Sequence, residues 1–421
     1  LLKPLYIKGF SLHFVRYSEL MKLRYRYRIY PTGQQAQSLA QLFGCSRVAW
    51  NNTLAFCQSS YAQGEKYPGF AALSKRLTAI KQTEGMLWLT DVAAVPLQQS
   101  LRDLDVAFRH FFQSATGKRK GAKVRMPRFK KRSNAQSARF TGTAFRVADK
   151  LTLAKVGAVK VRWSRELPPA PSSATVIRDA AGRYFVSFVV EVDRSLLPWC
   201  EQSCGVDLGI TTFATLDDGT KIDAPKPLKR HLKKLARLQR RLARSEKGSN
   251  RRRAAVYAVA KVHARIKDIR TDFLHKLSTR LIRENQSISL EDLNVAGMMR
   301  NRKLSKAISD LGWRTFRTMV EAKGKMYGRD ITIISRWEPT SQTCSVCGHR
   351  EGRKKLSVRE WQCLNCGAQH DRDINAAVNI KVAGGQSETQ NGRRRACKSG
   401  TPAVLVDASN QPHFGQLSLS F

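Results

Sequence analysis

The chain has 421 residues, and its 75 lysine and arginine side chains against 32 acidic ones give a formal net charge of +43. Self-repulsion of this strength indicates a polyanionic partner. No stretch approaches the roughly 18 apolar residues that a membrane span needs, and no signal peptide is evident. Nucleic acid is therefore favoured over a membrane surface, and the length accommodates two or three domains.

The first predicted element is a strand at 23–30, where apolar and basic residues alternate as in a half-buried strand. Residues 1–20 before it are expected to be an upstream extension. The basic face of the strand either contacts phosphates or is a solvated strand face. Its candidate nucleic-acid contacts are Arg24, Arg26 and Arg28.

Helical segments are predicted from 32 to about 115. Thr32 and Gln35 form a capping-box pattern that marks the first helix start. Apolar residues then recur at helical spacing, which predicts core-facing stripes. These are Leu39, Leu42, Phe43, Leu97, Leu101, Leu104 and Phe108.

A basic segment follows at 118–132, with nine lysine or arginine residues in fifteen and no acid. Gly121 and Pro127 argue against a helix there. The segment is either a disordered linker or, given its interleaved apolar residues, a strand-like piece that docks and offers cations to a phosphate backbone. The candidate contacts are Arg128, Lys130, Lys131 and Arg132. Strand patterns at 151–163 and 174–192 could join the strand at 23–30 in a small barrel interrupted by the helical block.

A second fold is predicted from about Cys204. Residues 205–219 form an apolar strand that carries Asp207, and a charge in a buried strand is costly unless it is paired or binds a metal. A helical pair follows, and 226–253 holds thirteen basic residues against one acid. Like charges destabilise an isolated helix, so this face is either solvated or meets phosphates. The candidate contacts on it are Lys233, Arg237 and Arg240.

Three further motifs carry chemistry. A strand at 287–295 ends in Glu291 and Asp292, and 370–380 reads HDRDINAAVNI with acids Asp371 and Asp373. Between them, paired C-x2-C motifs fifteen residues apart can present four thiolates to one tetrahedral zinc ion. The zinc candidates are Cys344, Cys347, Cys363 and Cys366. A purely structural zinc ribbon in a binding protein is the alternative to an enzyme.

Three carboxylates from separate elements suit a two-metal site, because Mg²⁺ prefers oxygen ligands and two ions can activate water and stabilise the leaving oxygen. We assign Asp207 as the bridging ligand, with Glu291 and Asp373 at the sides. Asp292 and Asp371 are alternatives, and their competing interpretation is turn and helix capping. The five other cysteines form no disulfide framework, which is consistent with a reducing cytosol. They are Cys45, Cys57, Cys200, Cys204 and Cys397.

These motifs, in this order, resemble the TnpB family, the RNA-guided nucleases of bacterial insertion sequences and relatives of type V CRISPR effectors. The resemblance rests on MKLRYRYRIYPT, WNNTL, PRFKKR, GVDLGITTFATL, SLEDLNVAGM, the two cysteine knuckles and HDRDINAAVNI, and it extends from Met21 to about Ile380. It implies an α/β fold with a small β-barrel: a RuvC-type, ribonuclease-H-like nuclease domain with an inserted zinc ribbon, and an amino-terminal wedge barrel interrupted by a helical recognition block. It places the catalytic triad on Asp207, Glu291 and Asp373, and the zinc ligands on the four knuckle cysteines.

The resemblance also implies domain limits and partners. The expected segments are an extension at 1–20, a barrel at 21–31 and 118–200, a helical block at 32–117, a nuclease domain at 201–340 and 370–383, a zinc ribbon at 341–369, and a disordered tail at 384–421. The implied partners are a transposon-derived guide RNA and a double-stranded DNA target next to a short motif, in the bacterial cytoplasm and at the nucleoid. The implied cofactors are two Mg²⁺ ions and one structural Zn²⁺.

Two other functions stay open. A catalytically idle RNA-guided repressor would keep the nucleic-acid grip, but all three acids are present here. A three-acid transposase is chemically possible, because the same two-metal site can join as well as cut. The eight histidines show no pair of the kind that a tyrosine transposase needs.

Overall fold

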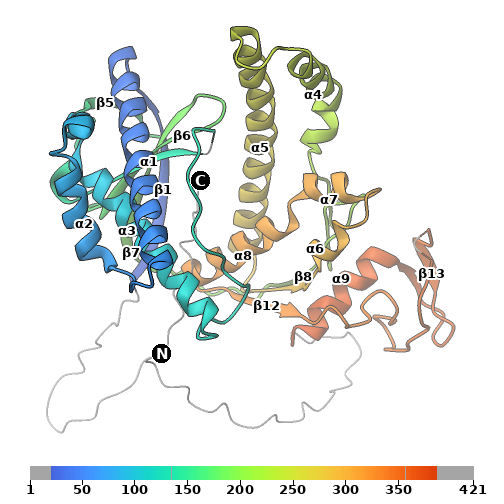
Figure 1. Ribbon diagram of the computed structural model, residues 1–421. Helices are drawn as coiled ribbons and strands as arrows, with labels where there is room; N and C mark the ends of the chain where they lie inside the picture. Colours follow the sequence, from blue (N-terminus) through green and yellow to red (C-terminus); the bar gives the residue numbers. More distant parts are fainter. Residues whose placement is uncertain (1–19, 134, 356, 386–421) are drawn as a thin grey trace, which may run out of the picture. The chain divides into compact units, whose positions relative to one another are not determined.

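The computed structural model describes residues 20–133, 135–355 and 357–385 (Figure 1). The predicted extension, except for Leu20, and the tail from 386 lie outside the described residues. The chain divides into two compact units, one of Lys22–Val192 and one that starts at Asp193. Within the described residues, no helix has the length and apolar character needed to cross a membrane.

The first unit contains a strongly curved sheet in the strand order β2-β6-β7-β1-β5-β4-β3. Its edge strands β2 and β3 are joined by the short turn Gly142–Ala144, so the two edges of the sheet come together in a nearly closed barrel. The strands are β1 (Leu20–Tyr30), β2 (Gln136–Thr141), β3 (Phe145–Val147), β4 (Leu151–Leu153), β5 (Gly157–Arg162), β6 (Ser173–Arg178) and β7 (Tyr184–Asp193).

The alternation predicted for the first strand is confirmed, since Leu23, Tyr27 and Ile29 of β1 are buried. Inside the barrel, the Tyr27 ring meets Trp163 edge-on with centroids 5.0 Å apart, and Trp163 stacks on Phe188 at 6.2 Å. Aromatic pairs in these geometries add to the stabilisation from buried area. Strands β2 and β3 are not in the sequence prediction.

A helical block lies between β1 and β2 in the chain, as predicted. It contains α1 (Gly33–Ala62), α2 (Gly69–Ile80), a 3₁₀ turn (Glu84–Thr90) and α3 (Ala94–Ala115). The capping box at the start of α1 is confirmed: Gln35 N donates to Thr32 Oγ1, and Thr32 N donates to Gln35 Oε1. All seven residues of the predicted apolar stripes are buried where these helices pack together.

The second unit is built on a five-stranded sheet in the order β10-β9-β8-β11-β12. Strands β8 (Ser203–Asp207), β11 (Ser287–Glu291) and β12 (Asp330–Ile334) are parallel, while β9 (Ala214–Leu216) and β10 (Lys221–Ile222) continue the sheet in antiparallel fashion. Parallel strands end at the same edge of a sheet, so side chains at the ends of β8 and β11 are brought together.

Helices cover this sheet. Helix α8 (Trp313–Tyr327) packs on β12 and on α5 (Asn250–Glu284), and α9 (Arg372–Ala383) packs on β8. The approach of α9 requires a glycine, because a Cβ on Gly205 would lie 2.1 Å from the carbonyl oxygen of Ala377. The start of α9 is thereby held over the strand that carries Asp207.

A long hairpin of α4 (Pro227–Ala243) and α5 rises from this unit (Figure 1). Its seam is small, with Leu235, Val262 and Ile266 buried, whereas Leu232 of α4 is 44% exposed. Short helices α6 (Val295–Met298) and α7 (Ser305–Leu311) follow β11. Charge repulsion on so basic a hairpin must therefore be offset by contacts at its base.

Asp310 at the end of α7 supplies such a contact. Its buried carboxylate accepts hydrogen bonds from the backbone N–H groups of Leu228 (2.9 Å) and Lys229 (3.3 Å) at the start of α4. The same carboxylate pairs with Arg270 of α5 at 2.9 Å. One side chain thus caps α4 and ties it to α5 and α7.

We expect Asp310→Ala to destabilise the second unit by about 3 kcal/mol, because it removes a helix cap and leaves Arg270 without its partner. Amide hydrogen exchange in α4 should rise and the melting temperature should fall. The control is Asp272→Ala, which breaks an exposed ion pair with Lys276 and should cost less than about 1 kcal/mol. Equal effects of the two changes would contradict the anchoring role of Asp310.

Candidate functional site

Three predicted site residues meet at the carboxyl edge of the parallel strands. Asp207 is the last residue of β8, and Glu291 is the last residue of β11. Leu290 pairs in register with Val206, so the two acids follow each other on neighbouring strands. Asp373 lies in the first turn of α9, the helix that packs on β8.

The carboxylates of Asp373 and Glu291 are close enough to Asp207 to change its pKa. Burial, then the nearby carboxylates of Asp373 and Glu291, raise the pKa of Asp207 to about 7. Burial and the neighbouring Asp292 also raise the pKa of Glu291. Buried acids with raised pKa values are typical of functional sites, and bound cations would relieve their mutual repulsion.

The two alternative acids have other partners. Asp292 is held by Arg317 and Arg336, whose hydrogen bonds lower its pKa. Asp371 is the N-cap of α9 and accepts from the N–H groups of Asp373 and Ile374. Burial alone would raise the pKa of Asp371, but its 2.7 Å contact with Lys221 and the backbone donors lower it. The helix-capping interpretation of Asp371 is therefore confirmed.

Asp373 is partly neutralised by an arginine that the sequence prediction did not include. Arg359 Nη1 lies 3.3 Å from Asp373 Oδ1 and comes from the cysteine-containing segment that precedes α9. This segment also holds a small hairpin of β13 (Glu360–Gln362) and β14 (Gln369–Asp371). The cysteine-containing segment, which separates Glu291 from Asp373 in the sequence, thus contacts Asp373 through Arg359.

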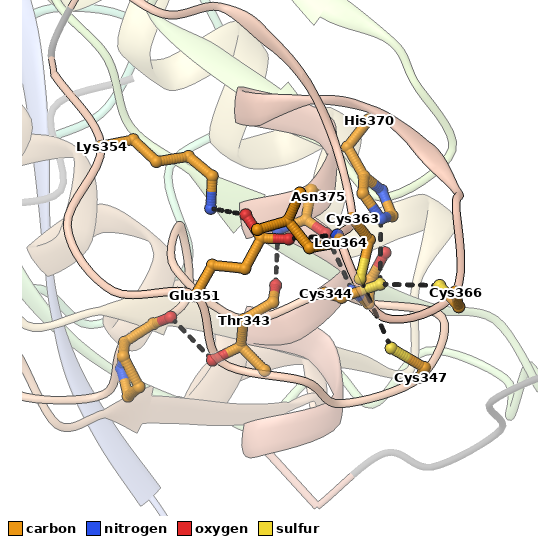
Figure 2. A network of polar contacts seen from close by, with 12 residues as sticks. Thr343, Cys344, Cys347, Glu351, Lys354, Cys363, Leu364, Cys366, His370 and Asn375 are labelled. Carbon is orange, nitrogen blue, oxygen red and sulfur yellow. Dashed lines mark hydrogen bonds and ion pairs between the residues drawn. The ribbon is translucent and has the colours of Figure 1, made fainter.

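The four knuckle cysteines converge on one point (Figure 2). Their sulfur atoms all lie within 4.8 Å of one another, with Cys344 and Cys366 3.7 Å apart and Cys347 and Cys363 3.6 Å apart. Tetrahedral zinc with Zn–S distances of about 2.3 Å places sulfurs about 3.8 Å apart. The donor set and its spacing therefore fit a structural Zn²⁺, as predicted.

The neighbourhood of the cysteines supports this fit. His370 Nε2 lies 3.0 Å from Cys344 Sγ, where an imidazole N–H can donate to a metal-bound thiolate (Figure 2). Trp361 covers the imidazole, with ring centroids 4.6 Å apart. Glu351 accepts a 2.7 Å hydrogen bond from the Leu364 N–H and closes the second knuckle against the first.

Asn375 and Asn379 join the cysteine segment to the third acid. The Nδ2 atoms of both donate to the carbonyl oxygens of Thr340 and Thr343, and Asn375 Oδ1 accepts from the Ser345 N–H. Asn375 is 2% exposed and follows Asp373 by two residues. Sequence reasoning missed both asparagines, although their spacing of four on an apolar helix was the available signal.

The predicted basic residues of the first unit lie in two settings. Arg26 stacks 3.9 Å above the Phe185 ring, and Arg28 lies 5.0 Å from the same ring, so this face of β1 is partly covered. Burial lowers the pKa of Arg24. The solvated-face interpretation of this strand therefore does not describe Arg26.

The basic segment at 118–132 docks but is not a strand, which corrects the strand-like prediction. Asn51 of α1 exchanges two hydrogen bonds with the backbone of Lys130 (3.0 and 2.8 Å), and Trp50 Nε1 donates to the Arg128 carbonyl oxygen. The side-chain amide of Asn51 thus makes the two backbone hydrogen bonds that a neighbouring strand would otherwise make. Lys130 itself lies over the Trp50 ring at 3.7 Å, and burial lowers its pKa to about 8.

Of the four candidate contacts in this segment, Arg128, Lys131 and Arg132 are exposed. In the second unit, Lys233, Arg237 and Arg240 are also exposed on α4. A cavity of about 730 Å³ lies where α4 turns toward α5. Its lining includes Arg237, Arg240, Arg241, Arg244 and Arg251. Both surfaces present clustered cations of the kind that contact phosphates.

The fold is of the Cas12f1-like class. It aligns with the protein chain in "Cryo-EM structure of the Cas12f1-sgRNA-target DNA complex", with a TM-score of 0.50, 13% identity and 83% coverage of each chain. Residues 313–380 match the "Cas12f1-like, TNB domain" model, 187–302 the OrfB_IS605 model described as "Probable transposase", and 21–66 a "Helix-turn-helix domain" model. In this chain, residues 21–66 form a strand followed by one long helix.

Sequence relatives narrow the class to one family. A Streptomyces pristinaespiralis protein named "Putative RNA-guided DNA endonuclease" is 44% identical over 369 residues, which cover 86% of this chain and 90% of the relative. "Putative RNA-guided DNA endonuclease InsQ" of Escherichia coli K12 is 30% identical over 86% of this chain and 92% of the relative. The chain belongs to the TnpB (OrfB, IS605-type) family, and the resemblance inferred from the motifs is confirmed.

Proposed function

We propose that this protein is an RNA-guided DNA endonuclease of a transposable element, which cleaves target phosphodiesters at Asp207, Glu291 and Asp373 next to a short flanking DNA motif. The observation that carries the proposal is the meeting of these three acids at one sheet edge, where burial and the other two acids raise the pKa of Asp207. Support comes from the family, whose members above are named as putative RNA-guided DNA endonucleases.

The second unit is then a RuvC-type, ribonuclease-H-like nuclease domain. Its support is a sheet of three parallel and two antiparallel strands with acids on two adjacent strand ends and on a packed helix. The cysteine segment at 341–369 is its zinc insert. The domain limits given above, with a barrel at 21–31 and 118–200 around a helical block at 32–117, are part of the proposal.

The chemistry follows from the acids. Two Mg²⁺ ions held by Asp207, Glu291 and Asp373 would supply an activated water and charge stabilisation for the leaving oxygen. Arg317 and Arg336 keep Asp292 out of this set.

The guide would be a transposon-derived RNA held by the basic surfaces, because a chain of charge +43 requires many phosphates for neutralisation. The target would be double-stranded DNA, read by pairing with the guide. A second candidate is a transposase that uses the same three acids. The description of the matching family model as "Probable transposase" favours it, and a two-metal site can join as well as cut.

The test combines RNA sequencing with cleavage. RNA that co-purifies with the expressed protein should be one discrete species from the end of the element. That complex, with Mg²⁺, should cut a plasmid that carries the guide-matched site and leave a scrambled site intact. Random RNA fragments would sink the RNA-guided class, and strand joining without guide dependence would establish the transposase.

The docked basic segment gives a quantitative prediction. We expect a smaller salt dependence of RNA binding when Arg128, Lys131 and Arg132 are changed together to Ala. The slope of log K against log salt concentration should become shallower by about 2 to 3, at about 0.7–0.9 per lost phosphate contact. Lys130 is left in place because it packs on Trp50. The matched control changes Arg128 and Arg132 to Lys, which keeps the charge and should keep the slope. An unchanged slope in the Ala variant would move the phosphate contacts to α4.

A further inference from the structure

Trp337 is the most exposed tryptophan of the chain, with 86% of its surface accessible. Isolated exposed apolar residues are ordinary on protein surfaces. The position of this one is not ordinary, because it lies three residues after β12, at the same sheet edge as the acids. Ile334, the last residue of β12, pairs in register with Glu291, and the Asp292 N–H donates to the Ile334 carbonyl oxygen at 3.1 Å.

The turn that carries Trp337 is tied down by its own hydrogen bonds. The Glu338 N–H donates to the Ser335 carbonyl oxygen at 3.1 Å, and the Trp337 N–H donates to Ser335 Oγ at 3.3 Å. Arg336, the residue before Trp337, donates from Nε to Asp292 Oδ2 at 3.0 Å. The exposed indole thus lies on a hydrogen-bonded turn, and Arg336 ties the start of this turn to Asp292, the residue after Glu291.

The second half of the turn is anchored beside the third acid. Asn379 of α9 donates to the Thr340 carbonyl oxygen at 2.8 Å, three residues after Trp337. Asn375, on the same helix as Asp373, donates to Thr343 O at 2.8 Å. Trp337 therefore lies on a segment that connects β12, the neighbour of the strand that ends in Glu291, to contacts with α9, whose first turn carries Asp373.

The surroundings favour nucleic acid as the occupant. A cavity of about 390 Å³ at this edge is lined by three arginines, Arg314, Arg317 and Arg336, and by three acids, Glu291, Asp292 and Glu321. Arg317 and Arg336 are paired with Asp292, so the exposed Arg314 is the arginine of this lining that can meet a nucleotide phosphate, and the open indole offers a face on which its base can stack. Base stacking on an aromatic side chain requires an unpaired base, since paired bases are covered on both faces.

We propose that Trp337 is a stacking platform for an unpaired base of the DNA strand that enters the carboxylate edge, and that it thereby favours single-stranded substrate there. This inference rests on the proposed nuclease function. It adds a substrate-contacting residue that lies outside the acid triad and outside the zinc ligands.

The direct test is photocrosslinking, which needs no cleavage. The full-length protein, with its co-purified RNA and without divalent metal, is irradiated with single-stranded DNA oligonucleotides that each carry one 5-iododeoxyuridine. Mass spectrometry should find the crosslink on Trp337, and Trp337→Phe should retain it in part. The control residue is Trp199, which is 73% exposed and precedes β8 at the opposite edge. A crosslink to Trp199 instead, to the RNA alone, or none at Trp337 would overturn the proposal.

The kinetic test measures cleavage of short single-stranded oligonucleotides. Trp337→Ala should raise KM by about 5- to 150-fold, the loss expected for one stacked base, with kcat little changed. Trp199→Ala should leave both unchanged. An abasic residue at the sensitive position should raise the KM of the unmodified protein similarly and add nothing in Trp337→Ala. Equal KM values for Trp337→Ala and the unmodified protein would refute stacking even if cleavage is intact. A Trp337 crosslink without any cleavage would instead refute the nuclease function and leave stacking supported.

Discussion

Replacing Asp207 by Ala should abolish Mg²⁺-dependent DNA cleavage and leave RNA binding nearly intact. The substitution removes a carboxylate that lies near Glu291 and Asp373, and it removes no cation from the basic surfaces. Metal ions supply several kcal/mol of transition-state stabilisation, so the rate should fall on the order of 10³-fold or more. Cleavage of a guide-matched plasmid and RNA-binding titrations, measured on the same preparation, check the two halves of this expectation.

The neighbouring acids provide matched controls. Asp373→Ala should be as inactive as Asp207→Ala, whereas Asp371→Ala should retain cleavage and lose about 1 kcal/mol of stability, because Asp371 caps α9. Asp223→Ala, an exposed acid after β10, should behave like the unmodified protein. If Asp371→Ala is inactive while Asp373→Ala is active, the third acid has been assigned to the wrong residue.

The second large effect is expected at the cysteines. Cys344→Ser should reduce bound zinc from one ion per chain toward zero, because a structural site with three thiolates loses much of its affinity and metal binding contributes on the order of 10 kcal/mol to the folding of such small modules. The hairpin at 360–371 should lose protection from hydrogen exchange. Cleavage should fall as well, since Asn375 and Asn379 connect this segment to the helix of Asp373.

Cys200→Ser is the matched control, because Cys200 lies outside the four-cysteine group. It should change neither the zinc content by elemental analysis nor the exchange pattern. Intact protein that contains no zinc would contradict the assignment of the cluster. Full zinc occupancy in Cys344→Ser would indicate that His370, 3.0 Å from Cys344 Sγ, can replace the lost thiolate.

Features encoded in short stretches were predictable. The cysteine spacing specified the four-thiol cluster, because two C-x2-C turns have few ways to present their sulfurs. The capping box of Thr32 and Gln35 and the apolar stripes of α1 and α3 follow from rules that involve residues within one or two turns. The family could be recognised because several such short motifs occur in one fixed order.

Features that depend on contacts between distant segments could not be predicted from the sequence. Strands β2 and β3 are short, and they become strands through pairing with β6 and β4 rather than through their own pattern. The segment at 118–132 docks through Asn51, 79 residues earlier in the chain, and no local signal distinguishes that from a free linker.

The acids show the division most clearly. Sequence alone determined that carboxylates stand at 207, 291, 292, 371 and 373, at the ends of predicted elements. Only the tertiary structure showed which of these acids have other partners. Arg317 and Arg336 form ion pairs with Asp292, and Lys221 and the backbone N–H groups of α9 bind Asp371. Asp207 and Glu291 were left close to Asp373, which also pairs with Arg359. The pKa of a carboxyl group depends on burial and on charges within a few ångströms, and those neighbours come from elements up to 166 positions apart, which no local pattern specifies.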